Sequence, residues 1–106
     1  MSEFKKNLEF LPSVEGIERL ELFEEGNSQP VLAIENKPGK AGSVAVYHAI
    51  EKEYGRLDHE SANAGLEIFA EHVISAAKTP GAHPNIDFLF RVIENDQVLS
   101  IKIIEK

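Results

Sequence analysis

The sequence contains no cysteine among its 106 residues. This absence excludes a disulfide scaffold, a thiolate zinc or iron–sulfur site and a cysteine nucleophile. Long apolar runs are absent as well, since stretches such as residues 31–34 fall far short of the ~18 residues that suggest a membrane span. The amino terminus also has no apolar segment of signal-peptide length. We therefore expect a protein of the microbial cytoplasm, without a membrane partner.

Positive charge is scarce too. Eleven Lys and Arg residues face eighteen Asp and Glu residues, a net charge of 11 − 18 = −7. This balance argues against a domain whose main partner is the phosphate backbone of nucleic acid. The charge is unevenly placed, because residues 1–25 carry three bases and seven acids, whereas residues 37–43 hold two lysines and no acid.

The composition is that of a folded globular protein. Hydrophobic residues make up 42% of the chain and charged residues 27%, which are ordinary values and exclude wholesale disorder. A chain of this length is expected to form one domain, spanning residues 1–106, with a modest core.

Both ends of the chain and its first third show clear periodicity. Apolar residues at helical spacing predict a short helix over 2–11, which we expect to lie as a flap over one side of the core. Residues 17–24 and 31–34 have strand patterns, and the turn residues between them predict a β-hairpin. A final strand is predicted over 98–105.

Three helices are predicted between these strands. We expect Ser43, Asp58 and Asn85 to cap their starts. Gly55 suits the left-handed end of the first of them. The longest, after Asp58, has the clearest apolar stripe, at Ala62, Leu66, Phe69, Val73 and Ala77.

These elements predict an α+β fold. A small antiparallel three-stranded sheet, formed by the hairpin and the C-terminal strand, carries three to four helices mainly on one side, in the order α-β-β-α-α-α-β. The other sheet face is partly apolar, with Ile17, Phe23, Val31, Ala33, Val98 and Ile104. Either the first helix covers this face, or a second copy of the chain does, which would make a homodimer through the sheet face.

The loop 37–43 is a candidate anion site. Gly39 and Gly42 allow tight turns, and unpaired amides at a helix start attract a phosphate or carboxylate. Lys37 and Lys40 would supply charge and Ser43 a hydroxyl donor. The alternative is a strand-to-helix turn with solvated lysines. The spacing is not that of a Walker A loop, and a Gly-x-x-Gly clamp of the KH type would join two helices rather than follow a strand.

Four histidines form the second set of candidates, namely His48, His59, His72 and His83. Histidine is the usual general base at neutral pH and a common metal ligand. No two are four residues apart, so only the fold would bring them together. His83 lies between Pro80 and Pro84 and is held stiffly, two residues before Asn85. The sequence predicts no metal site, no cofactor and no catalytic residue.

Two longer strings resemble a known family. Residues 35–48, from Glu-Asn-Lys-Pro-Gly to Tyr-His, and residues 83–87, His-Pro-Asn-Ile-Asp, resemble a small proteobacterial family known only as domain of unknown function 2322. The helix over 65–72 is similar to that family as well. The resemblance implies a bacterial, single-domain protein and brings no activity, substrate or catalytic residue with it.

Two functions follow as hypotheses. The leading one is a soluble bacterial binding or interaction protein without catalytic activity. The alternative is a small-ligand protein, or an enzyme, in which the loop 37–43 binds an anion and His48, His72, His83 and Asn85 complete the site.

Overall fold

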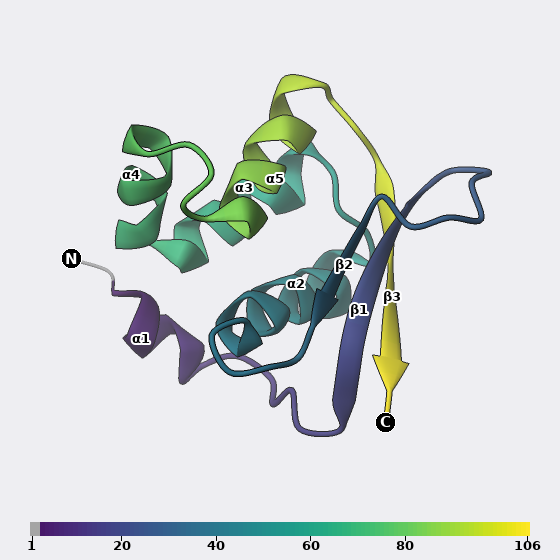
Figure 1. Ribbon diagram of the computed structural model, residues 1–106, viewed down its shortest axis with the longest axis horizontal. Helices are drawn as coiled ribbons and strands as arrows, with labels where there is room; N and C mark the ends of the chain where they lie inside the picture. The colour runs from purple at the N-terminus through teal and green to yellow at the C-terminus, as the bar shows by residue number, and fades with distance from the viewer. Residues whose placement is uncertain (1–2) are drawn as a thin grey trace.

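The computed structural model describes residues 3–106 and has two layers, a three-stranded sheet and a group of helices on one side of it (Figure 1). The elements follow in the order α1 (Phe4–Leu8), β1 (Ile17–Glu24), β2 (Leu32–Glu35), α2 (Ala41–Tyr54), α3 (His59–Phe69), α4 (Glu71–Lys78), α5 (Pro84–Glu94) and β3 (Leu99–Glu105). The predicted α+β class, antiparallel sheet and order of elements are confirmed. None of the helices within 3–106 is long and apolar enough to cross a membrane.

The sheet has the strand order β2-β1-β3, with both pairs antiparallel. Leu20, Leu22 and Ile34 point toward the helices and are buried, as the alternation predicts. Ile17 was expected on the outer face, but this prediction is wrong. A register shift between Ile17 and Arg19 turns Ile17 into the core, where it is 5% exposed.

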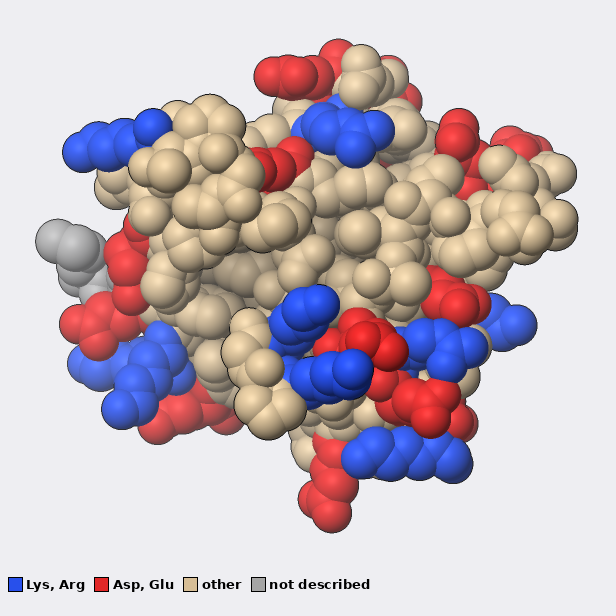
Figure 2. All heavy atoms as spheres, viewed as in Figure 1, with Lys and Arg blue, Asp and Glu red and all other residues tan. Residues whose placement is uncertain are grey.

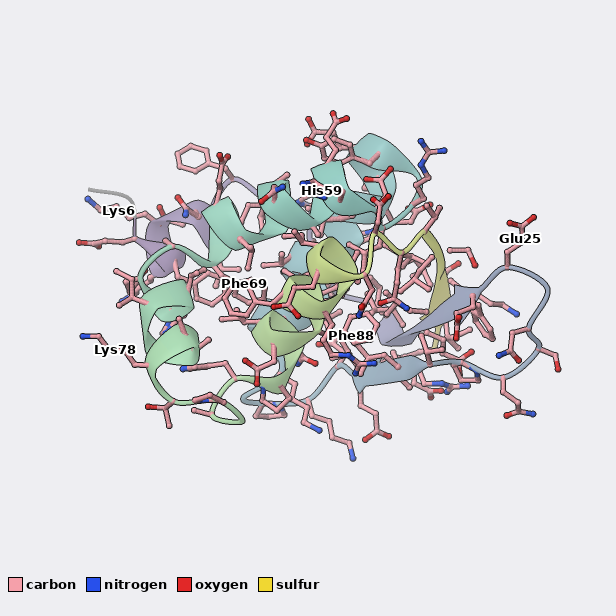
Figure 3. The ribbon with its side chains drawn as sticks, turned by 90° about the horizontal axis from the view of Figure 1, so that it is seen from above. Lys6, Glu25, His59, Phe69, Lys78 and Phe88 are labelled. Carbon is pink, nitrogen blue, oxygen red and sulfur yellow. The ribbon has the colours of Figure 1, made fainter. Side chains whose placement is uncertain are left out.

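The outer face of the sheet has no helix over it in the described chain. Figures 1 and 3 both place the helices on the opposite side, with α1 at the far end from the sheet. The alternative in which the first helix covers this face is therefore wrong, since α1 contacts α2 and α3 instead. Val31 and Val98 remain 39% and 58% exposed there.

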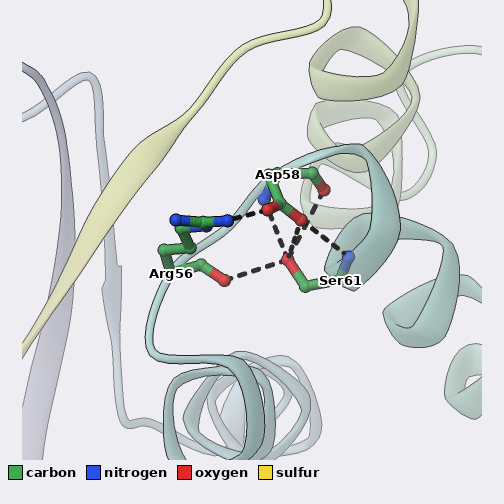
Figure 4. Close-up of polar contacts among 3 residues, drawn as sticks. All are labelled: Arg56, Asp58 and Ser61. Atoms are coloured by element: carbon green, nitrogen blue, oxygen red, sulfur yellow. Dashed lines mark hydrogen bonds and ion pairs between the residues drawn. The ribbon is translucent and has the colours of Figure 1, made fainter.

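The helix caps agree only in part with the predictions. Asp58 caps α3 in a reciprocal box: its carboxylate accepts the Ser61 N–H at 3.0 Å, and the Ser61 hydroxyl accepts the Asp58 N–H at 2.8 Å (Figure 4). Gly55 ends α2 with φ 77°. Ser43 and Asn85 are not caps, because α2 and α5 begin earlier and their flanking residues make no side-chain capping bond.

The long predicted helix is two helices, α3 and α4, which brings the helices of the described chain to five. The chain breaks at Ala70, whose backbone has φ 53° and ψ −119°. The change of direction puts Ala76, not the expected Ala77, against the core. It also turns the start of α4, with His72, toward the loop that precedes α5.

The core lies between the sheet and helices α2, α3 and α5. Tyr47, Ile50 and Leu89 are each at most 1% exposed. Gly65 lets α3 approach α2 and α5 closely, because a Cβ there would stand 2.9 Å from Cδ1 of Ile50 and 3.1 Å from that of Leu89. Leu57, just before α3, exchanges two backbone hydrogen bonds with Leu99 of β3, so the α2–α3 connection is tied to the sheet.

Candidate functional site

A cavity of about 700 Å³ opens where the edge strand β2, the start of α2, the start of α5 and helix α1 meet. Its size is within the range of small-ligand sites. In Figure 2 the same face is hollowed beside the loop that precedes α2, and Lys and Arg atoms gather over that loop. The cavity is lined by Phe4, Leu8, Leu32, Ala33, Ile34, Gly39, Lys40, Ala41, Gly42, Ser43, Phe69, His72, Ala82, His83, Pro84, Asn85 and Ile86.

The loop before α2 forms a tight turn that presents the helix start to the cavity. Gly39 has φ 88° and follows Pro38, and the Lys40 N–H donates to the Lys37 carbonyl at 2.9 Å, as in a type II turn. The Ala41 N–H donates to the same carbonyl. The next two amides, those of Gly42 and Ser43, have no acceptor among the hydrogen bonds of the described residues.

The lining of the cavity includes a lysine and no carboxylate. Of the eighteen acidic residues in the chain, none is among those that line it, whereas Lys40 and two histidines are. Lys37 points elsewhere, because its Nζ lies 3.0 Å from a carboxylate oxygen of Glu35. This hydrogen bond lowers the pKa of Glu35. Of the two lysines in the loop, Lys40 therefore lines the cavity and Lys37 does not.

Two histidines converge on the cavity from different elements. The rings of His72, on α4, and His83, before α5, have centroids 5.5 Å apart. His83 Nε2 lies 3.2 Å from the Ser75 hydroxyl, and the His72 and Phe4 rings form a T-shaped pair with centroids 5.1 Å apart. Both residues line the cavity, and imidazole nitrogens are groups that can hydrogen-bond to a ligand.

Helix α1 forms one wall of the cavity and is held by polar contacts. The Phe4 N–H donates to the Glu71 carboxylate at 2.8 Å, which lowers the pKa of Glu71. The Asn7 amide donates to the Ile68 carbonyl at 2.9 Å. The Phe4 ring packs 5.3 Å from the Phe69 ring and against Gly42, where a Cβ would stand 3.0 Å from Phe4 Cζ. The helix predicted over 2–11 is shorter, since it spans Phe4–Leu8, and position 2 lies outside the described residues. It contacts α2 and α3 as a flap over that part of the molecule.

The opposite wall is fixed by a buried tyrosine. The Tyr47 hydroxyl, on α2, donates to the Asn85 carbonyl at 2.6 Å and anchors the segment that begins α5. Tyr47 is fully buried, and burial raises the pKa of its hydroxyl, so it stays a donor. Asn85 therefore helps to shape the cavity through its backbone.

Seven of the nine residues proposed from the sequence lie together around this cavity, namely Gly39, Lys40, Gly42, Ser43, His72, His83 and Asn85. Lys37 and His48 do not line it. His48 is partly buried on α2, which lowers its pKa, and its Nδ1 has no partner in the described chain. His59 is exposed at the far end of α3 from Phe69 (Figure 3).

Sequence reasoning missed the apolar half of the site. Phe4, Phe69, Ile34 and Ile86 belong to four different elements, and each carried only the signal of a core residue. Within residues 3–106 no three side chains of the His, Asp and Glu types lie close enough to hold a metal ion. The arrangement can hold an anionic group beside an apolar surface.

One protein family matches the chain over nearly its whole length. A family model described as "Uncharacterized protein conserved in bacteria (DUF2322)" matches residues 4–103. The comparisons with curated proteins and with solved structures gave no match. Since the family model covers nearly the whole chain, the protein belongs to this bacterial family, DUF2322.

Proposed function

We propose that the protein binds, without transforming it, a small molecule that carries a carboxylate or phosphate on an apolar body. The observation that supports this most is that Lys40 and the unpaired amides of Gly42 and Ser43 lie beside apolar walls in one cavity. In an acidic chain, a cavity that is lined by Lys40 and by no carboxylate favours an anionic ligand.

The two halves of the cavity have separate tasks in this proposal. The anionic group accepts hydrogen bonds from the amides of Gly42 and Ser43, with the charge of Lys40 nearby. The apolar body contacts Phe4 and Phe69, where burial of apolar surface contributes most of the affinity. His72 and His83, which also line the cavity, add polar contacts.

Octanoate tests the proposal by isothermal titration calorimetry, with octanamide as its neutral counterpart. We expect octanoate to bind and octanamide to bind more weakly. Lys40→Gln should weaken octanoate binding by about threefold, the size of an exposed charge interaction. Lys37→Gln is the matched control, because Lys37 lies in the same turn but pairs with Glu35 outside the cavity. Absence of octanoate binding, or equal binding of both compounds, would contradict the proposal.

We also propose that the chain forms a homodimer through the outer face of the sheet. Phe23, Val31 and Val98 leave apolar surface there without a cover in the described chain. The charged residues that the strands direct to this face are Arg19, Glu21, Glu35 and Lys102, two of each sign. Because the charges on this face balance, two copies of the chain can approach each other through it, although each has a net charge of −7.

Sedimentation equilibrium tests the dimer. We expect a dimer at high micromolar concentration, and a monomer when Phe23→Glu places an unpaired charge in the interface. Ile74→Glu is the control, since Ile74 is 62% exposed on α4, at the other end of the molecule (Figure 1). A wild-type protein that stays monomeric at these concentrations contradicts the dimer.

A further inference from the structure

Strand β2 is an edge strand whose free side borders the cavity. Within residues 3–106 it pairs with β1 alone, because the strand order is β2-β1-β3. The cavity touches three consecutive residues of β2, namely Leu32, Ala33 and Ile34. Successive side chains of a strand point to opposite faces, so a cavity that touches all three lies along the edge.

The backbone of this edge has unpaired polar groups. The Asn36 N–H donates to the Glu18 carbonyl at 2.9 Å, so position 36 faces β1. In the register that continues from there, Ile34 also faces β1 and Ala33 faces away from it. The N–H and C=O of Ala33 therefore point to the open side, and Ala33 is exposed. An open edge of this kind is a template for another extended chain.

The edge leads to the positive end of the cavity. The loop that follows β2 carries Lys40, and the free amides of Gly42 and Ser43 come directly after it. A ligand that lies along β2 and ends here must present backbone hydrogen-bonding groups along its length and a negative charge at its end. The carboxyl-terminal segment of a polypeptide has both features.

We propose that the ligand of the cavity is the C-terminus of a polypeptide, which adds to β2 as a further strand and places its carboxylate at the start of α2. This inference rests on the proposed function and specifies its ligand. The loop to α2 leaves the carboxyl end of β2, so the added strand runs parallel to β2. An apolar last side chain packs against Phe4 and Phe69.

Fluorescence polarisation with a labelled hexapeptide that ends in valine and leucine tests the proposal. The free acid should bind about tenfold more tightly than the same peptide with a C-terminal amide, because the amide loses charge-assisted hydrogen bonds. Two further peptides are N-methylated at neighbouring amides near the carboxyl end. Only one of these two should lose binding, since alternate amides face the partner strand.

A variant of the edge gives the complementary result. Ala33→Pro removes the outward N–H at an edge position, where proline is tolerated. It should abolish binding of the peptide acid, with circular dichroism showing a retained fold. Ala33→Ser keeps the N–H and is the matched control. Because the methylated peptides use the wild-type protein, the proposal is still tested if Ala33→Pro fails to fold.

The outcomes separate this inference from the function on which it rests. If octanoate binds and the peptide acid does not, or if both methylated peptides bind equally well, the peptide is not the ligand, and the anion-binding proposal stands. If neither octanoate nor the peptide acid binds, both proposals fall.

Discussion

At the scale of single residues, Asp58 illustrates how one side chain orders a helix. Its bonds with Ser61 pair two backbone N–H groups at the α2–α3 connection, and Arg56 approaches the same carboxylate at 2.9 Å (Figure 4). The bond from the Ser61 N–H lowers the pKa of Asp58. The ionised form is therefore the one that stabilises the fold.

Asp58→Ala is expected to lower the free energy of unfolding by about 1 kcal/mol at neutral pH, the typical loss of a helix cap. Because the folded pKa is lowered, this stabilisation is present above the unfolded pKa of about 4 and is lost as pH falls through the folded value. Urea denaturation of wild type and Asp58→Ala at several pH values measures this loss of stability. Glu67→Ala is the control, because Glu67 is exposed on α3. A difference between Asp58→Ala and wild type that persists at pH values far below 4 would contradict this account.

Ala70 is strained, because an L-residue rarely adopts φ 53° and ψ −119°. Ala70→Gly should relieve this strain and raise the free energy of unfolding by about 1 kcal/mol. Ala64→Gly, inside α3, is the matched control and should lower it by about 1 kcal/mol. Thermal melting measures both, and a loss of stability in Ala70→Gly would show that the backbone there is relaxed.

The correct predictions for single residues rest on local sequence signals. Asp58 and Gly55 were predicted because a cap and a left-handed helix end depend on the neighbouring few residues. Ser43 and Asn85 were misplaced as caps because the type II turn and Pro84 start their helices earlier. Nothing in the apolar stripe of α3 and α4 signals the break at Ala70.

At the scale of elements, α1 is the part of the fold that depends most on others. It has five residues and none of them is buried, so its position comes from Glu71, Asn7 and the packing of Phe4. An isolated helix of this length is not stable in water. The wall that it contributes to the cavity is therefore set by tertiary contacts, which explains why the sequence indicated a flap but not what it covers.

Phe4→Ala should weaken octanoate binding by about tenfold through lost apolar contact, while the melting temperature of the protein falls only slightly. Phe10→Ala is the matched control, since Phe10 is 85% exposed just after α1 and should leave both quantities unchanged. Isothermal titration calorimetry measures the octanoate affinity of the two variants, and thermal melting measures their stability. Equal octanoate affinity in both variants would mean that Phe4 does not contact the ligand.

At the scale of the whole molecule, the acidic charge and the cavity occupy different places. The net charge of −7 comes from residues spread over other surfaces, while the cavity gathers Lys40 and two histidines from separate segments. The sequence indicated the basic loop because its residues are contiguous. It could not show that Glu35 pairs with Lys37, or that β2 offers an open edge beside the same cavity, because both depend on the folded chain.

An anionic group that binds at the start of α2 would change the surroundings of the backbone N–H groups there. An amide proton–nitrogen NMR titration with octanoate reports on each of these N–H groups separately. We expect the amides of Gly42 and Ser43 to shift most, and those of Gly26 and Gly55, which do not line the cavity, to stay in place. Saturating octanoate that leaves Gly42 and Ser43 unshifted, or that shifts Phe23 and Val98 instead, would contradict this expectation.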